Sequence, residues 1–255
     1  VLAAREVSNN PLFLGFPNAV GVGGAFLGTQ MFYKISKKYS RLAALSLTFF
    51  VGALGSIVLF YSLIVDSFIL LMIGALILGF GQSATLQSRY AASFVASEKF
   101  KATALSLAVW FSVFGSVFGP RLVSVYSDYF DNLFNSELIV GYIVAMVGML
   151  FASASVLTFT SSNSSLREPA EVEEVAEKAI ESKKDGNILT LLLVLNHFTM
   201  VVIMSATPLH VQDIGETVEL VGVIISYHTL GMFLLSPILG NYVDKYGYKN
   251  FTYVG

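Results

Sequence analysis

Long apolar runs separated by short polar links dominate the chain from one end to the other. Each run is about 20 residues long, which is enough for an α-helix to cross a hydrocarbon core about 30 Å thick. We therefore predict membrane-spanning helices at about 14–33, 42–63, 68–93, 102–125, 138–159, 188–209 and 221–242. Residues 1–6 read as the tail of a preceding helix, and the chain, which opens at Val1 without a Met, is expected to be a fragment of a longer protein.

Composition agrees with a membrane protein. Hydrophobic residues make up 55% of the chain and charged residues 13%, with a mean hydropathy of +0.71, whereas a soluble domain is about 25% charged. The formal charge of −2 gives no reason to expect nucleic acid as a partner. The chain has no Cys, and its three His lack metal-ligand spacing, so we expect no metal, no cofactor and no enzyme activity.

The links between the predicted helices alternate in charge. Two links carry Lys34, Lys37, Lys38, Arg41, Lys99 and Lys101, whereas the links at Asp66, 126–137 and 210–219 contain acidic residues and no Lys or Arg. By the positive-inside rule, the basic links face the cytoplasm, which leaves Arg5 and Arg121 on the outer side. The sequence thus predicts a multi-pass protein of the plasma membrane with a consistent helix count.

One segment of the chain is rich in Ser, Glu and Lys. It divides the chain into residues 1–160, a linker at 161–187 and residues 188–255. The linker places an apolar stripe on a charged helix, at Val172, Val175, Ala176, Ala179 and Ile180. Two interpretations stay open, a helix along the cytoplasmic face that couples the two parts and a solvated linker with partial helicity.

Glycines cluster in the first predicted helix, where Gly24 and Gly28 form a GxxxG pattern. A phosphate-binding loop needs a preceding strand, and here the glycines lie within one apolar span. We therefore predict that they allow close packing of a neighbouring helix.

A charged turn follows the predicted helix 14–33 in the first part and the predicted helix 221–242 in the second part. In the second part, Gly240, Asp244, Lys245, Gly247 and Lys249 fit the pattern G-x-x-x-D-[RK]-x-G-x-[RK]. In the first part, Lys37 stands at the Asp position and Ser40 stands at the Gly position. Between them, the basic Lys38 corresponds to Lys245 of the second part. This repeated turn resembles the signature loop of the major facilitator superfamily.

A second resemblance lies in the sequence GSVFGP, with Gly115, Gly119 and Pro120. It is similar to the fifth-helix motif of proton-driven drug antiporters of the same superfamily. That motif continues with paired glycines, where this chain has Val123 and Ser124.

The resemblance implies a fold and a function. The fold is an all-α polytopic membrane protein with two pseudo-symmetric six-helix bundles, of which this chain covers the end of helix 1 to the start of helix 9. The implied function is secondary active transport of a small organic solute by alternating access, with the charged loops as gates. Proton-coupled efflux is one form of it, and an uptake permease of the same fold is the alternative. For Lys37, Lys38, Lys245 and Lys249, a role in topology alone is the competing interpretation.

Polar side chains inside the predicted helices are candidates for the solute pathway, because polar groups rarely face lipid. For His197 and His228, a structural hydrogen bond to a neighbouring helix and a substrate or proton site are both open. Arg89 and Arg121 lie near helix ends, from which they could reach the membrane surface. The candidates are Asn18, Gln82, Gln87, Arg89, Trp110, Arg121, Asn196, His197 and His228.

Two other classes of membrane protein are less well supported. A channel would need rings of polar or charged residues around a pore, and no such pattern is present. A membrane enzyme would need a catalytic acid or metal site within the spans, which the His spacing does not provide. The expected partners are a small-molecule substrate, protons in the proton-coupled form, and membrane lipid, with the protein as a monomer.

Overall fold

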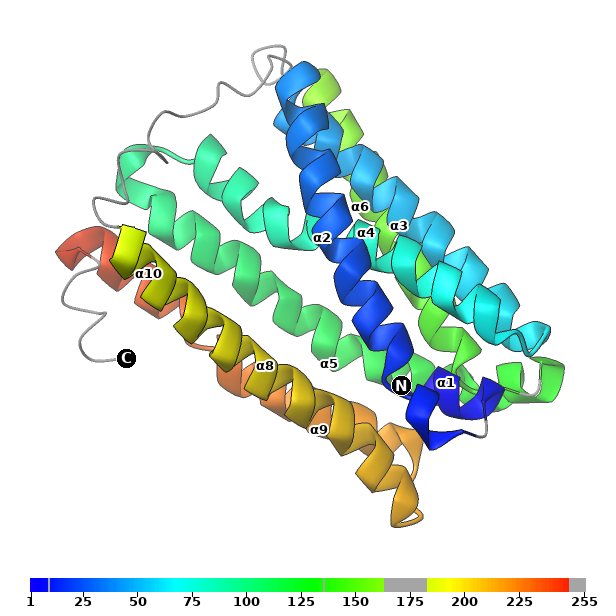
Figure 1. Cartoon of the computed structure of the whole chain (residues 1–255). Coiled ribbons are helices and arrows are strands. Elements are labelled where there is room, and N and C mark those ends of the chain that lie inside the picture. Colours follow the sequence, from blue (N-terminus) through cyan, green and yellow to red (C-terminus); the bar gives the residue numbers. More distant parts are fainter. Residues whose placement is uncertain (9, 135, 163–182, 248–255) are drawn as a thin grey trace.

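The computed structural model of the chain describes residues 1–8, 10–134, 136–162 and 183–247. These residues form helices and contain no strand (Figure 1). The elements are α1 Leu2–Val7, η1 Pro11–Phe13, α2 Phe16–Lys38, α3 Arg41–Ile64, α4 Phe68–Val95, η2 Glu98–Phe100, α5 Lys101–Phe134, α6 Ile139–Ser162, α8 Lys183–Asp213, α9 Val218–Phe233 and α10 Ser236–Tyr246. We call residues 1–162 the first half and residues 183–247 the second half.

Seven segments of the described chain are long and apolar enough to cross a membrane. They coincide with the seven predicted spans, and the predicted helical structure of these spans is thereby confirmed. Two helices continue beyond their predicted ends, since α5 runs to Phe134 and α8 runs to Asp213. Residues 121–134 contain no Gly or Pro, so the backbone continues its helical hydrogen bonds after the side chains become polar.

The last span is built from two helices. It covers Val218–Tyr246, but α9 ends at Phe233 and α10 begins at Ser236. Pro237 lies in the first turn of α10. A proline has no N–H and its ring clashes with the carbonyl four residues earlier, which is that of Phe233. Pro237 therefore explains the break, which sets the direction of α10.

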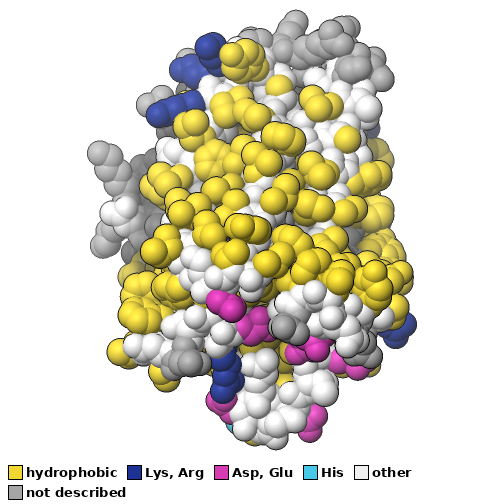
Figure 2. Space-filling model, turned by 90° about the vertical axis from the view of Figure 1, so that its right-hand side faces the viewer, with side chains coloured by type: hydrophobic (Ala, Val, Ile, Leu, Met, Phe, Trp, Pro, Cys, Tyr) yellow, Lys and Arg dark blue, Asp and Glu magenta, His cyan; other side chains and the backbone are white. Residues whose placement is uncertain are grey.

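Charge is distributed unevenly along the long axis of the molecule. On the face that Figure 2 shows, a cluster of Lys and Arg lies at one end, Asp and Glu with a few Lys or Arg lie towards the other, and a broad hydrophobic belt lies between them. We call the end that carries Lys34 and Lys99 the inner end and the opposite end the outer end. This distribution is the one that the positive-inside rule predicts. The predicted amphipathic helix at 172–180 lies outside the described residues.

Within the first half, α2 packs closely against α4. A Cβ atom added at Gly24 would meet the carbonyl oxygen of Leu76, and one added at Gly28 would lie 2.5 Å from that of Phe80. Only glycine allows the two backbones to approach so closely. The packing role predicted for the GxxxG pattern is confirmed.

Helix α5 joins the two halves, because it runs alongside α9 and α10 (Figure 1). Near the middle of this contact, the Ser226 hydroxyl donates a hydrogen bond of 2.5 Å to the Ser116 carbonyl. Towards the inner end, the Ser236 hydroxyl donates to the Ser106 carbonyl at 3.2 Å. In both of these contacts, a serine hydroxyl of the second half donates to a backbone oxygen of α5.

Candidate transport site and its two ends

At the inner end, the carboxylate of Asp244 on α10 binds the N-terminus of α5. Its Oδ1 accepts a hydrogen bond of 2.9 Å from the backbone N–H of Ala102. Its Oδ2 accepts one of 2.7 Å from the N–H of Thr103 and one of 2.6 Å from the Thr103 hydroxyl. We call this contact the inner clamp, since it joins the two halves.

The chemistry of a helix N-terminus explains this contact. Ala102 and Thr103 lie in the first turn of α5, where backbone N–H groups have no partner within the helix. A carboxylate satisfies these donors and interacts favourably with the positive end of the helix dipole. Asp244 thus acts as a cap supplied by another helix.

Gly240, one turn before Asp244, allows α10 to approach α5. A Cβ atom at this position would meet the Ser106 side chain and would lie 2.8 Å from the Ala102 carbonyl oxygen. Close approach is a requirement for the short hydrogen bonds of the carboxylate. Gly240 and Asp244 therefore form one structural unit.

The other residues of the signature turn surround this unit. Gly247 ends α10 with a φ of +82°, a conformation that favours glycine. The ammonium of Lys245 lies 5.2 Å from the ring centre of Tyr246, and Lys38 lies 5.3 Å from that of Tyr39 in the first copy. Lys249 lies outside the described residues.

The first copy of the turn serves its own half. Lys37 and Lys38 are exposed in the last turn of α2, where positive charge is favourable next to the helix C-terminus. Ser40 begins α3, and its hydroxyl accepts a hydrogen bond of 3.1 Å from the N–H of Ala43. The two copies therefore share a position in the repeat but make different contacts.

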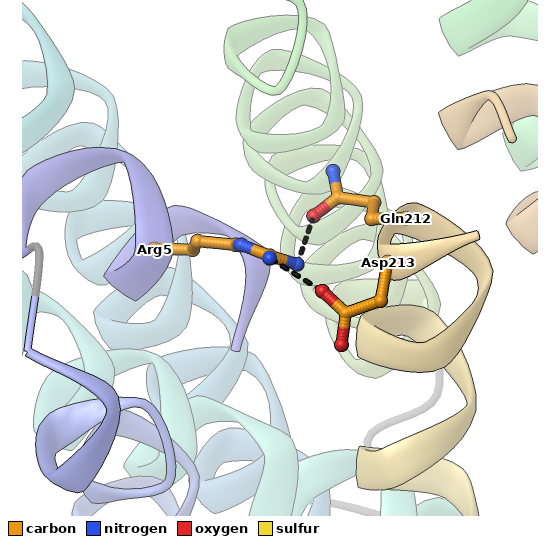
Figure 3. A network of polar contacts seen from close by, with 3 residues as sticks. All are labelled: Arg5, Gln212 and Asp213. Carbon is orange, nitrogen blue, oxygen red and sulfur yellow. Dashed lines mark hydrogen bonds and ion pairs between the residues drawn. The ribbon is translucent and has the colours of Figure 1, made fainter. Parts of the chain in front are cut away.

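At the outer end, Arg5 of α1 reaches the C-terminus of α8 (Figure 3). Its guanidinium forms an ion pair of 2.5 Å with Asp213 and a hydrogen bond of 3.4 Å with Gln212. Nearby on α2, the Asn18 amide donates a hydrogen bond of 2.7 Å to the Ser205 hydroxyl of α8. We call these contacts the outer tie, since they also join the two halves.

Acidic groups gather around Glu6, which lies outside the seven spans. Burial raises the pKa of the Glu6 carboxyl above its usual value, and the charges of Glu137, Asp131 and Asp66 raise it further. A hydrogen bond of 2.8 Å from the Ser136 hydroxyl opposes this shift. Glu6 thus holds its proton more tightly than an isolated glutamate in water does.

A cavity of about 500 Å³ lies between α5 and α9. Arg121 and Glu219 contribute opposite charges near the outer ends of their spans. The remaining lining residues continue inward and are mostly apolar: Val117, Pro120, Val125, Val223, Ser226, Tyr227 and Leu230. The cavity receives residues from both halves, is amphipathic and is large enough for a small organic molecule.

The sequence of the chain matches a known protein family. A family model described as "Major Facilitator Superfamily" matches residues 2–255. The chain belongs to the major facilitator superfamily. This membership confirms the predicted all-α polytopic fold, and the members of the superfamily are transporters rather than enzymes.

Similar proteins of this superfamily occur in bacteria. "Uncharacterized MFS-type transporter YdeG" and "Uncharacterized MFS-type transporter YddS" of Bacillus subtilis (strain 168) are 31% and 29% identical to the chain, and each match covers 96% of it. "Riboflavin transporter RfnT" of Brucella anthropi is 22% identical over 100% of it. The chain spans 60%, 59% and 63% of these relatives. No solved structure matches significantly.

The major facilitator fold brings some of the predicted polar residues together. Asn18 and Gln82 both line a cavity of about 180 Å³ between α2 and α4. Arg89 is predicted to reach the membrane surface from its helix end. Its guanidinium also lies 5.9 Å from the ring centre of Phe233, so it contacts the second half. Gln87 lines a separate cavity at the inner end.

Other predicted residues lie apart from these cavities. Asn196 and His197 are exposed on α8, and His228 is exposed on α9. Trp110 packs edge-on against Phe111 and Phe114, with ring centres 5.6 and 5.1 Å away. A role of these residues in the solute pathway stays a prediction.

Of the GSVFGP motif, Pro120 contacts the second half. A Cβ atom at Gly222 would lie 2.5 Å from the Pro120 Cβ. Gly115 and Gly119 would have no atom within 4 Å of an added Cβ. Pro120 therefore shapes the cavity between α5 and α9, which it also lines.

Sequence reasoning missed the residues that complete the clamp and the tie. Ala102 and Ser106, against which Gly240 packs, have the small-xxx-small spacing that is typical of close helix packing. This spacing could have indicated that another helix packs closely against the start of α5. Thr103 and Asp213 gave no comparable signal, because a polar residue at a helix end is common and its partner lies far away in sequence.

Proposed function

We propose that the full-length protein is a secondary transporter of the plasma membrane that moves a small organic solute by alternating access. The observation that carries the proposal is the inner clamp, in which Asp244 binds the N-terminus of α5 across the two halves. Breaking this contact frees the inner ends of α5 and α10 to separate. The loop carboxylate then acts as a gate.

In this proposal, the solute binds between the halves. The amphipathic cavity between α5 and α9 has a charged mouth at Arg121 and Glu219 and apolar walls deeper in. The inner clamp holds the inner ends of the two halves together, and the outer tie holds their outer ends together. Transport requires the two contacts to open in turn, because a pathway open at both ends would be a channel.

We further propose efflux coupled to protons, since GSVFGP resembles the fifth-helix motif of drug antiporters. His197 and His228 are the candidate proton sites within the spans, because an imidazole nitrogen can accept a proton and donate it again. Uptake by the same mechanism is the alternative direction. A relative is named as a riboflavin transporter, which makes riboflavin the first compound to assay. The proposed transporter works as a monomer in lipid.

Transport assays on the full-length protein test this function. Cells that express it are loaded with riboflavin or with members of a panel of drugs, sugars and amino acids, and uptake and efflux are followed with and without a proton gradient. Asp244→Asn is expected to lower transport of any active compound, and Asp66→Asn, the same change at an exposed outer link, is the control. Equal rates for Asp244→Asn and wild type would refute the gate.

A further inference from the structure

Arg121 and Glu219 line the same cavity from the two halves. Arg121 belongs to α5 and Glu219 to the first turn of α9, and both line the cavity of about 500 Å³ between these helices. Pro120, next to Arg121, packs against Gly222, which lies about one turn of α9 after Glu219. A cation and an anion therefore lie close together on the wall of one cavity.

Neither charged group has a partner within the part of the chain that the structure describes. There, Arg121 and Glu219 form no ion pair with each other and no hydrogen bond or ion pair with another residue. Both side chains are exposed, so both are accessible to a molecule that enters the cavity. The hydroxyl of Ser226 is not available as a donor to Glu219, because it donates to the carbonyl oxygens of Ser116 and Gly222.

Local structure accounts for only one of the two charges. Glu219 is an acidic residue in the first turn of α9, where it interacts favourably with the positive end of the helix dipole. Arg121 has no such role, since α5 continues beyond it to Phe134. Topology does not explain Arg121 either, because the positive-inside rule places basic residues on the opposite side of the membrane. Arg121 is therefore the residue whose position indicates a ligand.

We infer that this cavity binds a zwitterionic solute with an apolar body, such as an amino acid with a large apolar side chain. The fork of N–H donors of Arg121 matches a carboxylate, and the carboxylate of Glu219 accepts hydrogen bonds from an ammonium group. The apolar body lies against Val117, Val223 and Leu230. This inference rests on the proposed function, since it names the class of solute for the cavity in which transport is proposed to take place.

The pair of charges also disfavours other solutes. An anion that binds Arg121 is repelled by Glu219, and a cation that binds Glu219 is repelled by Arg121. An uncharged solute covers both charged groups without giving either a partner, which is costly. A zwitterion satisfies both groups at once, so the cavity should prefer it to singly charged and uncharged molecules with the same apolar body.

A set of matched compounds tests this preference. The full-length protein, purified in detergent, is titrated by calorimetry at about pH 6, at which free amino groups are protonated. L-Phenylalanine carries both charges, L-phenylalaninamide only the ammonium, N-acetyl-L-phenylalanine only the carboxylate, and N-acetyl-L-phenylalaninamide neither. We expect L-phenylalanine to bind about tenfold more tightly than each singly charged compound, since each of these lacks one charge-assisted contact.

Two variants should change the preference in opposite ways. Arg121→Gln should remove the preference for L-phenylalanine over L-phenylalaninamide and keep the one over N-acetyl-L-phenylalanine. Glu219→Gln should do the converse. Glu216→Gln is the matched control, because Glu216 is exposed near Glu219 in sequence and does not line the cavity; it should change each affinity less than about twofold.

The comparison within the wild-type protein does not depend on how well any variant folds. Failure of L-phenylalanine to bind, or binding no tighter than that of either singly charged compound, would overturn the inference. Retention of both preferences in Arg121→Gln and Glu219→Gln would also overturn it. These outcomes are separate from failure of the proposed function, because calorimetry measures binding alone. If another compound is transported in an Asp244-dependent way while L-phenylalanine does not bind, the transporter stands and the zwitterion site is wrong.

Discussion

Replacing Asp244 by Asn weakens the inner clamp while changing little else. The aspartate offers two acceptor oxygens to three donors on α5, namely the N–H groups of Ala102 and Thr103 and the hydroxyl of Thr103. An asparagine keeps one acceptor oxygen and places an NH₂ group where the other was. At least one N–H of α5 thereby loses its partner, together with the negative charge at the helix N-terminus.

The size of the effect follows from these contacts. A hydrogen bond to a charged group contributes about 1.5–3 kcal/mol, and because Asp244 is half-buried the lower end of this range applies. A loss of about 1.5 kcal/mol changes an equilibrium about tenfold. If closed and open inner ends are equally populated in the wild type, Asp244→Asn should favour the open inner end by about ten to one.

Spin labels at Lys99 and Asn241 can measure this change, because both side chains are exposed on opposite sides of the clamp. The distance distribution between the labels in the full-length protein should gain a longer component in Asp244→Asn, and transport turnover should fall. Asp66→Asn is the matched control, since Asp66 is exposed and has a φ of 48° that asparagine also tolerates. Unchanged distances together with wild-type turnover in Asp244→Asn would show that the loop is only a topology signal.

Three further predictions concern packing, topology and protons. Gly24→Ala should lower the thermal unfolding midpoint by overpacking against α4, at a cost of about 1–3 kcal/mol, whereas Gly23→Ala, with open space around its Cβ, should not; equal midpoints would contradict the close contact. Cys introduced at the exposed Asn132 should react with an impermeant thiol reagent from outside intact cells, whereas Cys at Lys99 should not; the reverse pattern would invert the topology. His228→Ala should weaken the dependence of transport on the proton gradient, and an unchanged dependence would show that this exposed imidazole carries no transported proton.

The spans could be predicted from the sequence because lipid imposes a strict requirement. Every backbone polar group in the hydrocarbon core needs an internal partner, so a long apolar run has to be a helix. Helix ends outside the core carry no such requirement, which is why the sequence predicts a link for the polar stretch before Phe134 although this stretch is helical. The break before Ser236 was missed because Leu234 and Leu235 continue the apolar run across it.

The signature turn identified Asp244 as important but not its partner. The donors on α5 are backbone N–H groups, and a sequence does not show which helix N-terminus a distant carboxylate will reach. The outer tie was missed for a related reason, since Arg5 and Asp213 are separated by 208 residues. Pairings of this kind depend on how the two halves meet, which no local pattern records.

The inner and outer ends of the molecule face the aqueous media on the two sides of the membrane. The outer tie includes an exposed ion pair, with side-chain exposures of 43% for Arg5 and 56% for Asp213. Dissolved salt screens this pair, because the screening length falls from about 8 Å at 0.15 M to about 3 Å at 1 M. The inner clamp rests on short hydrogen bonds to backbone amides, which salt weakens far less. Since the membrane separates the two media, a rise in external salt should loosen the outer end alone. External ionic strength would then favour the outward-facing state without any ligand.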